Sequence, residues 1–270
     1  MFILSPILAI GGMGLIFGAL LSIAAKIFAV EKDERIPQIL ECLPGANCGG
    51  CGFAGCSAAA EAIVKGEAQV NCCPVGGNEA AEKIAEIMGV VAEKTERMTA
   101  FVMCSGSSDA AKTKYDNNEC IDCHTAARLG GGLKECSFAC LGLGSCVKKC
   151  MYGALSIENG VAVVDREKCT NCGACMKECP KNIIKRVPYS VKAVVACSSK
   201  DKGKDTRNAC DAGCIGCGIC AKNCEAQAIT VVDNCAVIDY AKCTGCGLCQ
   251  EKCPRAAIKI FGQKPEVQTV

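Results

Sequence analysis

Tryptophan is absent from this 270-residue chain, histidine occurs once, and aromatic residues make up only 4% of the sequence. Large apolar side chains therefore contribute little to any core, which favours stabilisation by bound metal. The net charge is +2, and no basic stretch interleaved with aromatic residues occurs. These absences exclude a nucleic-acid-binding class, so no nucleic-acid partner is expected.

Nucleotide-binding signatures are missing as well. No GxGxxG fingerprint follows an expected strand, and no GxxxxGK[ST] loop occurs. Nicotinamide and flavin chemistry should therefore reside on partner proteins. The single histidine, His124, also excludes Rieske-type ligation, which needs two histidines, and we expect it to have a surface or packing role.

Cysteine, in contrast, is abundant, with 28 residues in the chain. Disulfide scaffolds reach such densities in small secreted domains, but this chain is long, shows no cleavable signal and spaces its cysteines in short CxxC runs. A reducing compartment and metal ligation fit this pattern better. The metal could be zinc or iron, and the spacing of the cysteines distinguishes the two.

The segment 1–30 is strongly apolar, and Lys26 is its only charged residue. About 20 apolar residues cross a bilayer core, so one transmembrane helix is expected here. Gly14 and Gly18 form a GxxxG spacing that would let another membrane helix approach. No basic residue precedes the segment, whereas three follow at its end: Lys26, Lys32 and Arg35. The positive-inside rule then predicts a single-pass protein of the inner (cytoplasmic) membrane whose remainder faces the cytoplasm.

A first cluster domain is expected at 31–98, around a glycine-rich loop that carries three cysteines. Together with a cysteine before a proline they supply four thiolates, Cys48, Cys51, Cys56 and Cys73. A [4Fe-4S] cluster is favoured over zinc, because CxxCxxxxC is an unusual zinc spacing. Cys72 is an alternative to Cys73, which is preferred for the proline after it. The ranges 57–65 and 79–98 predict packing helices.

Two later runs, at 169–180 and 243–254, match the CxxCxxCxxxCP pattern of bacterial two-cluster ferredoxins completely. In that pattern three cysteines hold one cubane and the fourth ligates the neighbouring cubane. Each run therefore requires a second cysteine run, its mate, to complete both cubanes. The predicted ligands of module 1 (99–190) are Cys136, Cys140, Cys146, Cys150, Cys169, Cys172, Cys175 and Cys179. Those of module 2 (191–270) are Cys214, Cys217, Cys220, Cys224, Cys243, Cys246, Cys249 and Cys253. Hairpins are expected near 154–164 and 229–238.

Module 1 lacks one ligand of the regular pattern. When the mates are superposed, Leu143 falls where Cys217 stands, and Cys136 is the nearest cysteine to replace it. The duplication extends further, because VMCSG around Cys104 resembles VACSS around Cys197, and the pair Cys136-x3-Cys140 echoes Cys210-x3-Cys214.

Five cubanes use 20 of the 28 cysteines, which leaves eight spares. We hypothesise that four of these, two from each module, hold a sixth cluster: Cys104, Cys123, Cys197 and Cys210. Buried free thiols are the alternative. The cofactors expected are thus at least five [4Fe-4S] clusters, with a sixth as a hypothesis.

The order of these segments resembles a known family. An apolar N-terminal helix, a PGANCGGCGFAGC loop, CPVGG and tandem ferredoxin motifs are similar to the B subunit of the Rnf ion-translocating ferredoxin:NAD oxidoreductase, in its long form with two modules. The resemblance covers essentially the whole chain. It implies a subunit of a translocase that accepts low-potential electrons from soluble ferredoxin and relays them to membrane and flavin-bearing partner subunits coupled to NAD reduction.

The fold expected is α+β, with one transmembrane helix, a small 4Fe-4S domain and two tandem ferredoxin modules. No organic active site is expected on the chain itself. Two other classes stay open at this point, namely a membrane-anchored polyferredoxin subunit of another respiratory oxidoreductase and a structural zinc scaffold. Different co-purifying partners would reveal the first, and a colourless protein the second.

Overall fold

A computed structural model describes residues 4–27, 33–114 and 122–261. The first element is helix α1 (Leu4–Ile27). Across the described ranges, no helix was found to be both long and apolar enough to cross a membrane. The transmembrane span expected at 1–30 therefore stays a prediction, and Lys32, one of the basic residues used to orient it, lies outside the described residues.

A small helical domain follows, made of α2 (Arg35–Cys42), α3 (Cys56–Val64) and α4 (Gly77–Met88). Its apolar core brings together Ile39, Ile63 and Ile84, each almost completely buried. The expectation of a helix to residue 98 is wrong, because α4 ends at Met88. Gly89 there adopts a left-handed φ of 66°, and the Val90 amide turns back to donate to the carbonyl of Ala85 at 3.0 Å.

Module 1 pairs its first and last strands around a central hairpin. The outer pair is β1 (Met98–Val102) with β4 (Ile184–Pro188), and the hairpin is β2 (Leu155–Glu158) with β3 (Val161–Val164), all antiparallel. Three short helices complete it, α5 (Cys123–Arg128), α6 (Ser145–Lys148) and α7 (Ala174–Glu178). A hairpin therefore forms in the range where short β-prone runs predicted one.

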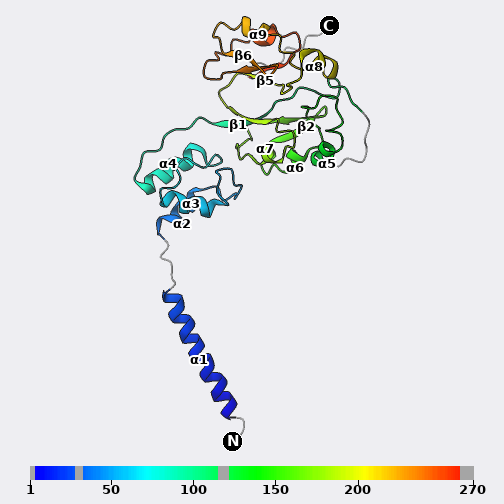
Figure 1. The fold of residues 1–270 in the computed structure, drawn as a ribbon. Coiled ribbons are helices and arrows are strands. Elements are labelled where there is room, and N and C mark those ends of the chain that lie inside the picture. Colours follow the sequence, from blue (N-terminus) through cyan, green and yellow to red (C-terminus); the bar gives the residue numbers. More distant parts are fainter. Residues whose placement is uncertain (1–3, 28–32, 115–121, 262–270) are drawn as a thin grey trace.

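Module 2 repeats this plan with different lengths. Its outer pair is β5 (Ala193–Val195) with β8 (Ile258–Ile260), and its hairpin is β6 (Ile229–Val232) with β7 (Cys235–Ile238). The helices are α8 (Gly203–Ala209), α9 (Ile219–Lys222) and α10 (Leu248–Glu251). In Figure 1 the helical domain, module 1 and module 2 follow one another along the chain, and the strands of each module pair only with each other.

Small buried side chains dominate the two module cores. Apart from cysteine, each core is built mainly from alanine, valine, leucine and isoleucine on the strands. Most cysteines of the two modules belong to these cores, whereas Cys217 and Cys246 are exposed. The fold thus wraps its strands and short helices around groups of thiols, as the scarcity of aromatic residues led us to expect.

Candidate iron–sulfur sites

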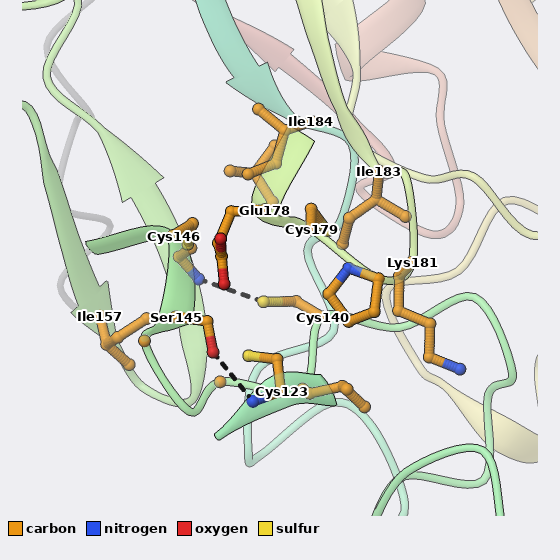
Figure 2. Close-up of a pocket in the computed structure, with 16 residues that line it drawn as sticks. Cys123, Cys140, Ser145, Cys146, Ile157, Glu178, Cys179, Lys181, Ile183 and Ile184 are labelled. Carbon is orange, nitrogen blue, oxygen red and sulfur yellow. Dashed lines mark hydrogen bonds between the residues drawn. The ribbon is translucent and has the colours of Figure 1, made fainter. Parts of the chain in front are cut away.

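In module 1, a first group of thiols surrounds a cavity of about 380 Å³. Figure 2 shows this cavity, lined by Cys123, Cys140, Cys146 and Cys179. Burial raises the pKa of the Cys146 thiol to about 12, with further contributions from the neighbouring thiols of Cys140, Cys123 and Cys179. The backbone amide of Ala162 donates to the Cys140 sulfur at 3.4 Å. Four thiols and an amide donor around one cavity are what a cubane requires.

Cys123 reaches this cavity through the local structure of α5. Asp122 caps the helix by accepting a hydrogen bond from the Thr125 amide at 2.8 Å, and the Cys123 amide donates to the Ser145 hydroxyl at 2.9 Å. Cys123 packs beside Leu143, the residue that stands where module 2 has a cysteine. The structure therefore places Cys123, and not Cys136, next to the position of the missing ligand.

A second thiol group of module 1 lines a cavity of about 320 Å³ and consists of Cys150, Cys169, Cys172 and Cys175. Burial raises the pKa of Cys175 to about 12, and the nearest other thiols contribute to the same shift. The Ala100 amide on β1 donates to the Cys169 sulfur at 3.4 Å, which ties this group to the outer strand pair.

Module 2 contains the corresponding two groups. One cavity, of about 370 Å³, is lined by Cys214, Cys217, Cys220 and Cys253. In the other group, burial raises the pKa of Cys249 to about 11, with contributions from Cys243 and Cys246. The fourth expected member, Cys224, packs in the same core, and its sulfur accepts a hydrogen bond from the Ala228 amide at 3.4 Å.

In the helical domain, the glycine-rich loop and the following CP segment come together. Cys51 and Cys56 are close enough to Cys73 to contribute to the raised pKa of its thiol, whose main cause is burial. The Gly76 amide donates to the Cys73 sulfur at 3.3 Å. Cys72 also lies in this core, where burial raises its pKa to about 11. Cys73 has the contacts expected of the fourth ligand, as its position before a proline suggested.

The helical domain is docked onto module 1 through the same loop. A Cβ atom on Gly50 would lie 2.6 Å from the carbonyl oxygen of Cys172, so only glycine permits this approach. Lys177 donates to the Gly49 carbonyl at 3.4 Å. The Tyr152 hydroxyl is buried nearby, and its raised pKa, caused mainly by burial, has contributions from Cys48, Cys172 and Cys73. Thiols of two domains therefore meet around one tyrosine.

Four further cysteines line a cavity of about 310 Å³ between the modules: Cys104, Cys136, Cys197 and Cys210. Sequence reasoning grouped three of these with Cys123 and placed Cys136 with Cys140, whereas in the structure Cys136 lines this cavity and Cys123 lines the one around Cys140. Cys235, another spare, donates to the Cys197 carbonyl at 3.4 Å. The ring of His124 pairs with the carboxylate of Glu178 at 3.1 Å, while Cys120 lies outside the described residues.

Family comparisons agree with these groups. Residues 43–75 match a family described as an Fe-S cluster domain, and residues 162–185 and 236–259 each match the 4Fe-4S binding domain. The chain is therefore an iron–sulfur protein of the ferredoxin class, with one cluster domain and two ferredoxin-type modules.

Relatives are similar over most of the chain. The B subunit of the Na(+)-translocating ferredoxin:NAD(+) oxidoreductase complex of Acetobacterium woodii is 46% identical, over 89% of this chain and 72% of the relative. The B subunit of the ion-translocating oxidoreductase complex of Methanosarcina acetivorans is 44% identical, over 89% and 91%. A proton-translocating counterpart from Clostridium ljungdahlii is 42% identical, over 84% and 81%. The chain belongs to the family of B subunits of Rnf-type ion-translocating oxidoreductase complexes.

Proposed function

We propose that this chain is the electron-transfer subunit of an ion-translocating complex, in which it accepts electrons from reduced soluble ferredoxin and relays them to membrane and flavin-bearing partner subunits coupled to NAD reduction. The observation that carries the proposal is the series of four-thiol groups, each around its own cavity, on a chain of this family. The relatives carry the names of ferredoxin:NAD(+) oxidoreductases, which supports the donor and the acceptor.

We assign five [4Fe-4S] sites. In module 1 the two sets are Cys123, Cys140, Cys146 and Cys179, and Cys150, Cys169, Cys172 and Cys175. In module 2 they are Cys214, Cys217, Cys220 and Cys253, and Cys224, Cys243, Cys246 and Cys249. The helical domain supplies Cys48, Cys51, Cys56 and Cys73.

Each cluster would supply one-electron chemistry with no bond made or broken in the protein. One electron leaves a reduced ferredoxin for each electron that enters the chain. Two such electrons and one proton turn NAD⁺ into NADH on another subunit. The residues of this chain hold the thiolates, exclude water from them and donate amide hydrogen bonds to their sulfurs, which tunes the potentials.

The exposure of two cysteines favours module 2 as the docking site for the soluble donor. Cys217 and Cys246 are exposed, one from each thiol set of this module. The corresponding Cys172 of module 1 is buried and lies against the helical domain. Electron exchange with a soluble protein needs a cluster near the surface, so the donor should bind module 2.

Helix α1 would attach the subunit to the membrane. Its described apolar side chains lie open to solvent, for example Leu15 at 79% exposure and Leu21 at 70%. Burial of such side chains in lipid is favourable, and a basic residue, Lys26, stands in the last turn. We propose a single-pass subunit of the inner membrane, with 1–30 as the anchor, 31–98 as the cluster domain and modules at 99–190 and 191–270 facing the cytoplasm.

The deciding experiment measures iron, sulfide and zinc in the anaerobically purified full chain, together with low-temperature EPR after dithionite reduction. Five cubanes correspond to about 20 iron atoms per chain, with overlapping signals of reduced clusters. Stoichiometric zinc without an EPR signal would overturn the proposal, because a structural zinc site carries no electron.

A further inference from the structure

We propose that Cys104, Cys136, Cys197 and Cys210 form a sixth [4Fe-4S] site, at the junction of the two modules. This inference deepens the proposed function and rests on it. Two of the thiols come from each module: Cys104 follows β1, Cys136 precedes Cys140, Cys197 follows β5, and Cys210 directly follows α8. The two pairs are equivalent positions of the duplicated unit, so the site has the internal symmetry of the chain.

The four junction thiols line one common space, as the thiols of three ferredoxin-type groups do. Cys136 lies near enough to the thiols of Cys197, Cys104 and Cys210 for each of them to act on it electrostatically. The junction therefore repeats the arrangement of the ferredoxin-type groups, with four thiols around one space.

Backbone amides already point at two of the sulfurs. The Cys104 sulfur accepts hydrogen bonds from the amides of Gly106 at 3.3 Å and Cys140 at 3.4 Å, and the Cys197 sulfur accepts one from Cys214 at 3.3 Å. Such donors stabilise thiolates that ligate clusters. Because Cys140 and Cys214 belong to the flanking thiol groups, the junction site stands directly between a group of module 1 and a group of module 2.

The loop around Gly106 and the segment after it hold the junction together. Strand-like bonds join the modules, with the Lys112 amide donating to the Ala209 carbonyl at 3.0 Å and the Asp211 amide donating to the Ala110 carbonyl at 2.7 Å. A Cβ atom on Gly106 would lie 3.4 Å from the Cys210 sulfur and 3.5 Å from the Cys104 sulfur. The backbone thus passes close to thiols of both modules and fixes their separation.

A buried lysine carries a positive charge, which the negative charge of thiolate-bound clusters would balance. Lys134 is only 8% exposed, and its ammonium donates to the carbonyls of Gly106 at 2.6 Å and Gly160 at 2.8 Å. Within the described part of the chain it makes no ion pair with a carboxylate. Burying an uncompensated cation is costly. Thiolate-bound clusters on both sides of its loop would provide the missing negative charge.

The four junction thiols do not form a site for a single metal ion. Over the described residues, no three or more His, Cys, Asp or Glu side chains converge closely enough to hold one metal ion. Zinc would draw its sulfurs to about 2.3 Å from a single centre. A cubane instead binds its four thiolates through four separate irons.

Paired substitutions test which cysteines share a site. In the full chain, Cys136→Ala combined with Cys210→Ala should remove one cluster, about four of about 24 iron atoms, because both residues serve the junction. Cys123→Ala combined with Cys210→Ala should remove two clusters, about eight iron atoms. The alternative grouping, which places Cys123 at the junction and Cys136 in module 1, makes the opposite prediction. A loss of about eight iron atoms from the first double variant and about four from the second would therefore overturn the grouping proposed here.

Cys42→Ala is the matched control, since Cys42 packs in the helical domain away from the thiol groups of the modules, and it should retain all the iron. The Cys→Ser versions of both pairs, with EPR spin counts, separate cluster loss from misfolding, because serine keeps the size of the side chain. A wild-type content of about 20 iron atoms, or zinc at the junction, would overturn the sixth site and leave the proposed function standing. A content of no iron would overturn both.

Discussion

The two ferredoxin modules share a strand plan but differ in what surrounds their clusters. In module 1, Cys172 is buried against the helical domain, whereas its counterpart in module 2, Cys246, is exposed. Module 1 takes its fourth thiol from a separate helix, while module 2 has a regular run that includes Cys217. The same scaffold therefore serves an internal position, enclosed on two sides, and a terminal position with an open face.

Leu143 shows how the internal position differs from the terminal one. Leu143 packs with Cys123, Ala126 and Leu141, so an apolar contact stands where module 2 has a cysteine, and we propose that α5 supplies the thiol instead. The segment that carries α5 also makes the backbone bonds to module 2. The stretch between Cys104 and Cys136 thus provides both the proposed ligand of module 1 and the backbone hydrogen bonds that join the two modules.

The largest effect is expected from Cys123→Ala, which should remove about four iron atoms, the content of one cluster, from module 1. Adding Leu143→Cys should restore them, because Leu143 holds the position of Cys217 and lies beside Cys123. Iron analysis and EPR of the full chain measure both steps. Full iron content in Cys123→Ala alone would contradict the assignment and make the two modules more alike than we infer.

The next effect concerns the enclosed face of module 1. Gly50→Ala places a methyl group against the Cys172 carbonyl, and overpacking of this kind costs about 1–3 kcal/mol. We expect a lower Tm and faster proteolysis at residues 89–97, between the helical domain and module 1. The EPR signals of module 2, which has no such contact, should not change.

Gly52→Ala is the control for this change. A Cβ atom there meets open space, and only the left-handed φ of 93° opposes the substitution. If the two variants were equally destabilised, backbone strain rather than the docking contact would explain the result.

A smaller effect is expected from Lys134→Met, which removes the buried cation beside the Cys104 loop. Module 2 has the neutral Asn208 at the equivalent position, two residues before Cys210. Loss of a positive charge destabilises reduced clusters, so the potentials of the adjacent clusters should fall by about 60 mV for each 1.4 kcal/mol lost. Redox titration followed by EPR measures the shift. Lys148→Met, at an exposed lysine, should leave the potentials unchanged.

The smallest effect is expected at Cys235, for which module 1 has Val161. The Cys235 thiol donates to the Cys197 carbonyl at 3.4 Å and lies beside the Cys197 and Cys214 thiols, where its presence as a donor lowers their pKa. Cys235→Val should keep all the iron and lower the potentials by roughly 40 mV, since one hydrogen bond contributes about 1 kcal/mol. The reverse change, Val161→Cys, should raise a potential in module 1. Loss of iron from Cys235→Val would identify Cys235 as a ligand.

Much of the site arrangement follows from sequence because three ligands lie within one short loop in four of the five proposed sites. The chain itself limits the distances in a CxxCxxC run, so the groups around Cys169 and Cys243 required no knowledge of the fold. The hairpins were also predictable from short β-prone runs, whereas the end of α4 was not, since a single left-handed glycine decided it.

The exchange of Cys123 and Cys136 shows where such reasoning stops. Chain proximity favoured Cys136, four residues before Cys140, whereas the contact of α5 with Ser145 brings Cys123 to that cavity, and we therefore propose Cys123 as the ligand. The sequence nevertheless contained evidence for the grouping that the structure shows, in which Cys136 lies with Cys210 at the junction. The repeat equates Cys136 with Cys210, and equivalent positions of a duplicated unit tend to have equivalent environments. Asp122 before Cys123 is also a typical helix cap, which marks Cys123 as the start of an ordered element.

The self-contained strand pairing of each module has a consequence for biosynthesis. Module 1 closes when β4 meets β1, before any residue of module 2 is needed. The junction, however, requires Cys210 as well as Cys104, and therefore both modules. During synthesis the two thiol groups within module 1 can therefore assemble first, and the junction site can assemble only after residue 210 has been added. A chain interrupted after residue 190 would carry both complete thiol groups of module 1 and two of the four junction cysteines, Cys104 and Cys136.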